Sequence, residues 1–235
     1  MDERQIPKVK LNLPKLRIPS AISFQNFDTE NKATSLLKQM EEERISLEKF
    51  YLEKNYERIE KKTEEYLSLF YGFVFPLENQ KKVCEEKIVR EKVLVTEGGD
   101  NYKETTPLLV SNNNHSNEDE IGLDEKYSKL RESFPFKWKS SFPSSDIEIM
   151  QSDSLYEVYC ILYNYAIACW NLLPKDKKLV FKRMLKISGI FEFLEDLFDE
   201  LKEKSDTKKN IAKALKLLCL CEAKEVFQKN PIINF

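Results

Sequence analysis

Three consecutive segments decide the fold, and the first, residues 155–173, reads LYEVYCILYNYAIACWNLL. The second, residues 180–201, reads VFKRMLKISGIFEFLEDLFDEL, and the third, residues 211–228, reads IAKALKLLCLCEAKEVFQ. The first segment has no polar face, so as a helix it must be covered on every side. The other two place apolar residues at helical spacing. We therefore predict three helices that stack on one another as in a helical solenoid.

Small side chains in these helices would let neighbouring helices approach closely, and we expect this at Ala166, Ala168, Ser188, Gly189, Ala214 and Ala223. The first helix approaches the length of a membrane span. However, Glu157, Asn164 and Asn171 would be costly in lipid, so we predict a helix that is buried in protein. Ser152 or Asp153 is expected to cap its amino end.

The composition favours a helical protein over a β protein, because five glycines accompany 41% apolar and 33% charged residues. The 38 basic and 40 acidic residues nearly cancel, so no global field favours nucleic acid. Residues 1–20 are polar and interrupted by prolines, so we expect no signal peptide and a cytoplasmic location. The unpatterned cysteines fit reduced thiols there: Cys84, Cys160, Cys169, Cys219 and Cys221.

The chain is predicted to open with a basic arm, residues 1–27, which includes a short extended segment at Ala21–Phe24. This arm either packs along the first helices or contacts anionic lipid. A helical hairpin follows in residues 28–96. Residues 97–122 read as a disordered insertion, because their glycine, asparagine and acidic runs cannot build a core. Residues 123–235 then form the helical core.

Within the hairpin, the first helix is expected to begin near Asp28 or Thr29, either of which can cap it. The second is expected to run from about Asn55 to Val74. The apolar stripe of the first helix, which we expect to be buried, consists of Leu36, Leu37, Met40, Ile45, Leu47 and Phe50.

Two features precede the long apolar helix. Tyr127, Leu130 and Phe134 form a short stripe at helical spacing. The aromatic segment 133–142 is bent by prolines, so it is not expected to be a regular helix, and we expect its phenylalanines and Trp138 to fill a gap between helical layers.

The insertion also carries a candidate sorting signal. Glu104, Leu108 and Leu109 match an acidic dileucine motif, in which a carboxylate and two leucines bind a clathrin adaptor. A plain loop without a partner is the alternative, because such short matches are common by chance.

The sequence contains no convincing set of catalytic residues, and we expect neither an enzyme nor a cofactor. The single histidine, His115, lies in the insertion, where no rigid partner can orient it. Cys219 and Cys221 are separated by one residue, so on a helix their side chains point apart. No second ligand pair accompanies them, and we therefore expect no zinc site.

Six short blocks carry a resemblance to a known family: AISF (21–24), YLSLFYGF (66–73), FKW (136–138), LYNYA (162–166), LKISGIF (185–191) and CEAKEV (221–226). In their order and spacing they resemble the Bro domain family, most closely its Brox- and ALIX-type ESCRT accessory proteins. The resemblance covers nearly the whole chain outside the insertion. It corresponds to roughly the amino-terminal half of the domain.

The resemblance implies an all-α, elongated solenoid of tetratricopeptide-like hairpins. It also implies an adaptor that binds the amphipathic carboxy-terminal helix of an ESCRT-III subunit of the charged multivesicular body protein class. Such an adaptor would be peripheral on endosomal or nuclear-envelope membranes. The matching groove residues are the aromatic Phe227, the lysine Lys178 and the neighbouring acidic Asp176. An ordinary core aromatic and a solvated lysine are the alternatives for the first two.

The sequence departs from the family pattern at its end. It stops before the helix that supplies the remaining apolar groove residues, so we expect an incomplete groove and exposed apolar surface. It also lacks the cysteine box for prenylation that Brox-type proteins carry. Two alternative functions follow. One is a helical scaffold that has lost ESCRT-III binding and engages another client through its end or its insertion. The other is a peripheral membrane protein that acts through the basic arm and the convex face of the solenoid.

Overall fold

The computed structural model describes residues 14–24, 33–74, 127–128, 130–141, 147–201 and 209–229. The chain divides into two compact units. One comprises residues 1–70 and 132–235, and the other residues 71–131. The predicted insertion 97–122 lies outside the described residues.

Five helices make up most of the described residues: α1 (Thr34–Glu53), α2 (Tyr56–Val74), α4 (Ser154–Asn171), α5 (Lys177–Glu200) and α6 (Lys209–Gln228). The predicted helical class is therefore confirmed, and the last three helices follow the three segments that suggested it. The start predicted for α1 is wrong, because Ala33 is not helical and the helix begins at Thr34. Asp28 and Thr29 lie outside the described residues.

Helices α1 and α2 form a hairpin with a tight turn. Lys54 ends α1 in the left-handed conformation, with a φ of 52°. The N–H of Asn55 then donates to the carbonyl of Phe50 at 3.0 Å, which satisfies one of the last carbonyls of the helix. Across the hairpin, the ammonium of Lys62 contacts the carboxylate of Glu43 at 2.8 Å.

The buried face of α1 differs from the predicted stripe in two positions. Leu37, Met40, Leu47 and Phe50 are buried as expected. Ile45 is 53% exposed and Leu36 is also exposed, whereas Arg44 is buried. The guanidinium of Arg44, and not the side chain of Ile45, therefore enters the core. It pairs there with the buried carboxylate of Glu157 on α4.

A small antiparallel sheet was absent from the sequence-based expectation. Its strands are β1 (Ile18–Pro19), β2 (Phe136–Lys139) and β3 (Glu148–Gln151), in that order. Ile18 lies opposite Lys139, and Trp138 lies opposite Ile149. The first strand precedes the segment Ala21–Phe24 that we expected to be extended, and that segment is not a strand.

The described part of the aromatic segment is not a helix, as predicted, and residues 136–139 within it form strand β2. The predicted helical stripe of Tyr127, Leu130 and Phe134 is wrong, because residues 130–134 form turns and bends. Pro135 disfavours a helical conformation in the residue before it. Phe134 and Phe136 do fill a gap as expected, with ring centroids 5.2 Å and 6.1 Å from that of Phe24.

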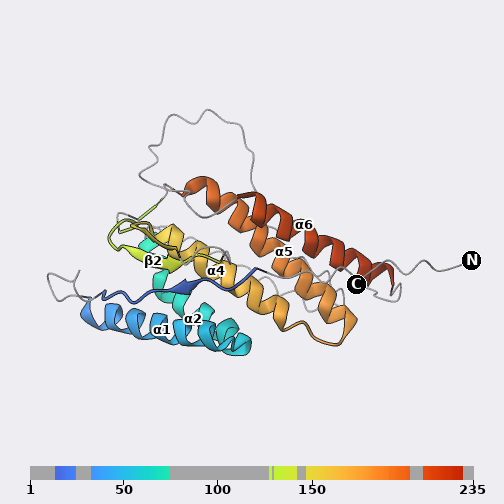
Figure 1. Ribbon diagram of the computed structural model, residues 1–235, viewed down its shortest axis with the longest axis horizontal. Helices are drawn as coiled ribbons and strands as arrows, with labels where there is room; N and C mark the ends of the chain where they lie inside the picture. Colours follow the sequence, from blue (N-terminus) through green and yellow to red (C-terminus); the bar gives the residue numbers. More distant parts are fainter. Residues whose placement is uncertain are drawn as a thin grey trace, which may run out of the picture. The chain divides into compact units, whose positions relative to one another are not determined.

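Helix α4 is the centre of the first unit (Figure 1). It contacts α5, which in turn contacts α6, and side chains of α1 and α2 bond to its other side. Asp153 caps α4 as predicted, accepting a hydrogen bond from the N–H of Leu155 at 2.9 Å. Almost every residue of α4 is buried, which confirms the prediction of a helix covered on all sides. Among the described residues, no helix is long and apolar enough to cross a membrane.

The small residues divide into two groups. Ala166, Ala168, Ser188 and Ala223 are buried. Ala214, by contrast, is exposed. A Cβ added to Gly189 would meet no atom within 4 Å, so the expected close approach at these two positions is wrong. Both lie on sides of their helices that face away from a neighbour.

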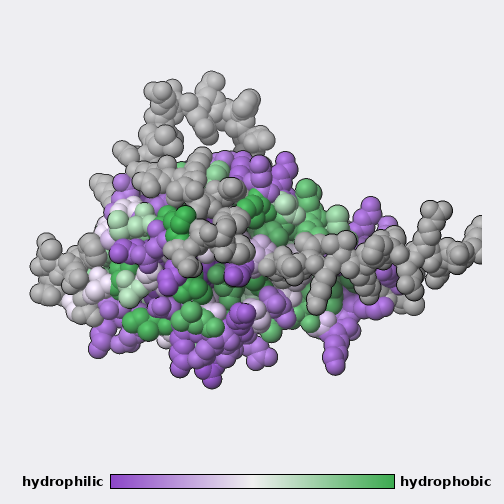
Figure 2. Space-filling view, in the orientation of Figure 1, coloured by the Kyte–Doolittle hydropathy of each residue, from purple (hydrophilic) through white to green (hydrophobic). Residues whose placement is uncertain are grey.

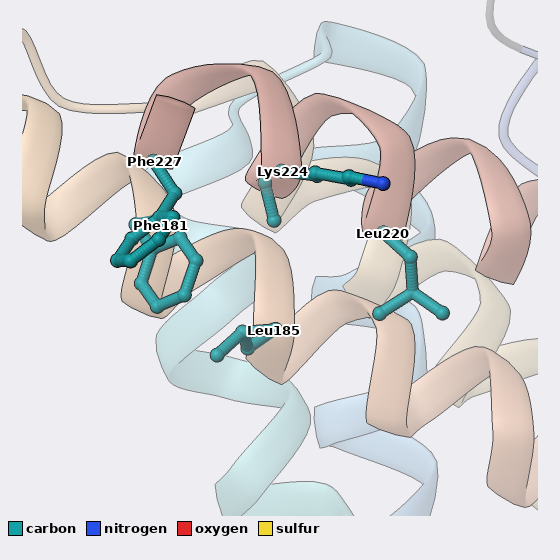
Figure 3. A pocket seen from close by; sticks show the side chains of 6 residues that line it. Phe181, Leu185, Leu220, Lys224 and Phe227 are labelled. Carbon is teal, nitrogen blue, oxygen red and sulfur yellow. The ribbon is translucent and has the colours of Figure 1, made fainter. Parts of the chain in front are cut away.

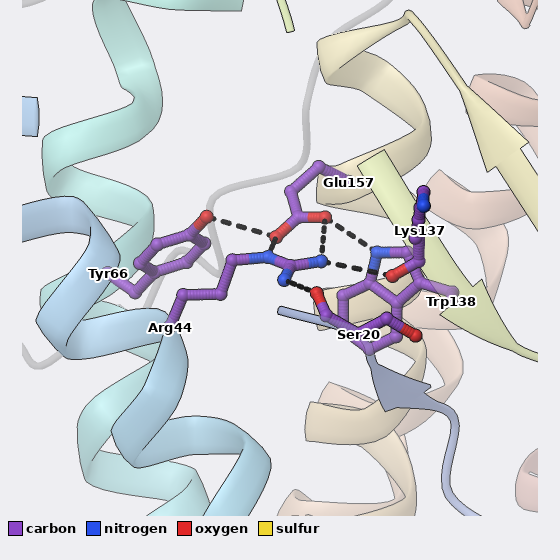
Figure 4. Close-up of polar contacts among 6 residues, drawn as sticks. All are labelled: Ser20, Arg44, Tyr66, Lys137, Trp138 and Glu157. Carbon is purple, nitrogen blue, oxygen red and sulfur yellow. Dashed lines mark hydrogen bonds and ion pairs between the residues drawn. The ribbon is translucent and has the colours of Figure 1, made fainter. Parts of the chain in front are cut away.

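A buried ion pair joins α1 to α4 (Figure 4). Nε of Arg44 lies 2.8 Å from Oε1 of Glu157, and both side chains are almost fully buried. The same carboxylate accepts hydrogen bonds from the hydroxyl of Tyr66 at 3.0 Å and from Nε1 of Trp138 at 2.6 Å. Burial alone would lower the pKa of Arg44, but Glu157 raises it, so the guanidinium keeps its charge.

The amino-terminal segment is fixed to the same core. Arg44 also donates to the carbonyls of Ser20 and Lys137, the latter at 3.1 Å (Figure 4). The amide of Asn164 on α4 bonds the backbone of Arg17 in both directions, at 2.8 Å and 2.7 Å. Residues 14–24 are therefore an integral part of the first unit and not a loose tail.

The second unit is described at residues 71–74, 127–128 and 130–131. Within it, the N–H of Ser128 donates to the carbonyl of Val74 at 2.9 Å. The guanidinium of Arg131 lies 4.4 Å from the ring centroid of Tyr127.

Candidate functional site: an apolar groove between α5 and α6

A hollow of about 310 Å³ lies between α5 and α6 (Figure 3). Its lining comes from Phe181 and Leu185 on α5 and from Leu220, Ala223, Lys224 and Phe227 on α6. On each helix these residues recur three or four positions apart, so they form one stripe along each side of the groove. We call this hollow the α5–α6 groove.

Ion pairs at one end of the two helices fix how they lie. The ammonium of Lys216 on α6 lies 2.8 Å from the carboxylate of Glu195 on α5, and Lys209 pairs with Asp199. The hydrogen bond with Lys216 lowers the pKa of Glu195, and the same bond raises the pKa of Lys216. The helices are thus antiparallel, which brings the start of α5 beside the end of α6.

One phenylalanine from each wall of the groove contributes to an aromatic pair. The rings of Phe181 and Phe227 lie 5.9 Å apart between centroids, at an angle of 38°. Phe227 and Leu220 are each 41% exposed, and Leu185 is 43% exposed. Figure 2 shows apolar surface over the α5–α6 pair with hydrophilic surface beside it. Contiguous apolar side chains that remain open to water are typical of a surface that binds a partner.

The sequence-predicted groove residues fall in different places. Phe227 lines the groove. Lys178 is exposed on the first turn of α5, one turn before Phe181, and does not line the hollow. Asp176 is the N-cap of α5, where its carboxylate accepts from the N–H of Leu179 at 2.9 Å. The carboxylate of Asp176 therefore stabilises the start of the helix that carries Lys178.

Sequence reasoning missed five residues of the groove, namely Phe181, Leu185, Leu220, Ala223 and Lys224. Leu220, Ala223 and Lys224 could have been found from spacing, because they lie seven, four and three residues before Phe227 on one helix. Phe181 and Leu185 lie on the other helix, and spacing alone does not connect them to Phe227. The candidate sorting residues Glu104, Leu108 and Leu109 lie outside the described residues.

The buried thiols near this region are poor nucleophiles. Burial raises the pKa of Cys169 to about 11 and that of Cys219 to about 12, so both stay protonated at neutral pH. In the part of the chain that the structure describes, no three histidine, cysteine, aspartate or glutamate side chains are arranged to hold a metal ion. The groove itself offers shape and apolar side chains, which are means of binding.

Comparison with known proteins gives one match. Residues 123–234 match the family model of the BRO1-like domain. This range contains β2, β3 and the helices α4, α5 and α6, and so includes both walls of the groove. No curated protein matches the chain.

Proposed function

We propose that this chain is a Bro-domain adaptor of the Brox and ALIX type, which binds the amphipathic carboxy-terminal helix of an ESCRT-III subunit of the charged multivesicular body protein class. The observation that carries the proposal is the α5–α6 groove, because Phe227 was chosen from the resemblance alone and lies in its lining. The groove also falls inside the range that matches the BRO1-like domain.

The shape and chemistry of the groove suit a helical ligand. An amphipathic helix presents apolar side chains at positions i, i+3 and i+4, which form a stripe. The two walls of the groove are stripes of the same helical spacing, and one phenylalanine of each wall contacts the other. Docking would remove the half-exposed rings and leucines from water, which is the main driving force for such association.

Charged side chains at the edge of the groove would set the register of the bound helix. Lys224 contributes its side chain to the lining, and Lys178 stands one turn beyond Phe181 on the opposite wall. Charged groups at the rim of an interface chiefly affect register and association rate. Asp176 acts in this proposal by capping α5 and so holding Lys178 in place.

The same proposal places the adaptor on endosomal or nuclear-envelope membranes as a peripheral protein. A clathrin adaptor that binds Glu104, Leu108 and Leu109 stays a prediction of the sequence.

A peptide titration tests the proposal. A labelled ESCRT-III carboxy-terminal helix is titrated into the purified chain, into Phe227→Asp and into Phe193→Asp. Phe193 is the matched control, because it is a similarly exposed phenylalanine of α5 that does not line the groove. We expect saturable binding that Phe227→Asp weakens at least about tenfold, as for an aromatic hot spot, and that Phe193→Asp leaves unchanged.

Circular dichroism confirms that all three proteins are helical. If the folded wild-type chain does not bind the peptide, the proposal is wrong. The helical scaffold that engages a different client would then be the better account.

A further inference from the structure

Helix α5 carries its charges in two separate blocks. All of its basic residues lie in the first half: Lys177, Lys178, Lys182, Arg183 and Lys186. All of its acidic residues lie in the second half: Glu192, Glu195, Asp196, Asp199 and Glu200. This order opposes the helix dipole, which favours anions at the amino end and cations at the carboxyl end. The helix dipole therefore does not explain why the basic block stands at the start of α5.

Both blocks contact neighbouring elements. The acidic block faces the lysines of α6, where Lys209 pairs with Asp199 and Lys216 pairs with Glu195. In the basic block, Arg183 pairs with Glu60 of α2, and Lys186 donates to the hydroxyl of Tyr165 on α4 at 2.7 Å. The side chains of the five lysines at the start of α5 are nevertheless exposed on the surface.

Exposed lysines are dense at the start of α5. Residues 175–186 contain five of them: Lys175, Lys177, Lys178, Lys182 and Lys186. The only acidic residue in this range is Asp176, whose carboxylate caps the helix. Between the lysines, Leu179 is 54% exposed. Leu179, Lys182 and Lys186 are three and four positions apart, so they share one face of the helix. We call Lys175, Leu179, Lys182 and Lys186 the lysine face.

We propose that the lysine face binds the anionic surface of a membrane, through the phosphate and carboxylate groups of its lipids. This goes beyond the peptide-binding function proposed above. Clusters of four to eight basic residues are the usual density for binding anionic lipid, and the three lysines of the face with the adjacent Lys177 and Lys178 make five. An exposed leucine among lysines is also typical of surfaces that rest on the lipid boundary.

The choice of lysine over arginine supports a membrane over a protein partner. A lysine ammonium is a hydrated point charge on a flexible stem, which suits a diffuse anionic surface. Arginine suits fixed two-point contacts, and the one arginine of the block is already bonded to Glu60. None of the residues of the face lines the hollow described above, so the face is separate from the surface proposed for the helical peptide.

The lysine face and the groove can be occupied together. One residue corresponds to about 100° of rotation in an α-helix. Lys182 and Lys186 therefore point about a quarter turn away from Phe181 and Leu185, which line the groove.

Vesicle sedimentation tests this inference. The purified chain is mixed with vesicles of phosphatidylcholine, with or without phosphatidylserine, at low salt and at about 1 M salt, where the screening length falls to about 3 Å. We expect binding only to vesicles that contain phosphatidylserine, and its loss at high salt. Neutralising one such lysine weakens binding about fivefold, so Lys175→Gln with Lys182→Gln should weaken it about 25-fold.

The matched control is Lys38→Gln with Lys49→Gln, which removes the same charge from exposed lysines of α1. We expect less than a twofold change for this control, and unchanged binding of the ESCRT-III peptide for the Lys175 and Lys182 variant. Equal loss in both double variants, or no preference of the wild type for anionic vesicles, would overturn the inference. Binding of a soluble acidic peptide that depends on Lys175 and Lys182 and displaces the vesicles would assign the face to a protein and overturn it as well.

Discussion

Replacing Glu157 by glutamine should be among the most destabilising single changes of near-constant volume in this protein. The carboxylate accepts hydrogen bonds from Nε and Nη2 of Arg44, from the hydroxyl of Tyr66 and from Nε1 of Trp138. Four donors fill the capacity of a carboxylate. The amide of glutamine has one oxygen to accept with, and its NH₂ group would face donors.

The magnitude follows from what remains after the change. Arg44 is buried, and its guanidinium would keep its charge beside a neutral group. Removing one partner of a buried ion pair costs about 3 to 5 kcal/mol, because the other charge is left without compensation. For a chain of 235 residues this corresponds to a fall of about 6 to 20 °C in the melting temperature.

Urea unfolding followed by circular dichroism measures the free energy of unfolding, with thermal melting as a second readout. The matched control is Glu43→Gln, which makes the same chemical change in the partly exposed pair with Lys62. A pair of that kind contributes about 1 kcal/mol or less. The reasoning is refuted if Glu157→Gln unfolds within about 1 kcal/mol of wild type with an unchanged urea slope, since that loss is no larger than a surface pair contributes.

Three further changes have expected outcomes. Asp153→Ala removes the side-chain cap of α4 and should lower the free energy of unfolding by about 1 kcal/mol in urea titration; an unchanged midpoint would contradict the role of the cap. Gly189→Ala adds a methyl group where no atom lies within 4 Å. Because alanine favours the helix more than glycine does, the change should raise the free energy of unfolding by up to about 1 kcal/mol. A lower free energy of unfolding in urea titration would show that the position is crowded. In a Cys84→Ser background, a thiol reagent at pH 8 should modify the exposed Cys221 first and leave Cys169 protected. Burial raises the pKa of Cys169 to about 11, so its thiol stays protonated and reacts slowly. Mass spectrometry of the peptides measures the order of modification, and modification of Cys169 first would contradict this prediction.

The helices could be predicted because their signal is local. The apolar positions from residue 155 onward repeat at helical spacing, and Asp153 supplies the cap directly before them. The sheet gives no such signal, since its strands span two to four residues each. Ile18 pairs with Lys139, and no pattern within either segment encodes that contact.

Arg44 shows the same limit for side chains. In the sequence it stands among glutamates and looks like part of a solvated helix face, while the neighbouring Ile45 looks buried. The structure reverses the two, because Glu157 lies in the core beside Arg44. Phe227 was found through the resemblance, but its neighbour Phe181 required the antiparallel packing of α5 and α6.

The Arg44–Glu157 pair also bears on when the protein can fold. Its partners are 113 positions apart, and the pair cannot form until Glu157 has left the ribosome. At about 5 to 20 residues per second, synthesis of the intervening chain takes roughly 6 to 23 s. During that interval the α1–α2 hairpin lacks α4, which would cover its apolar face. Nascent chains of this protein should therefore depend on chaperones until α4 has been made.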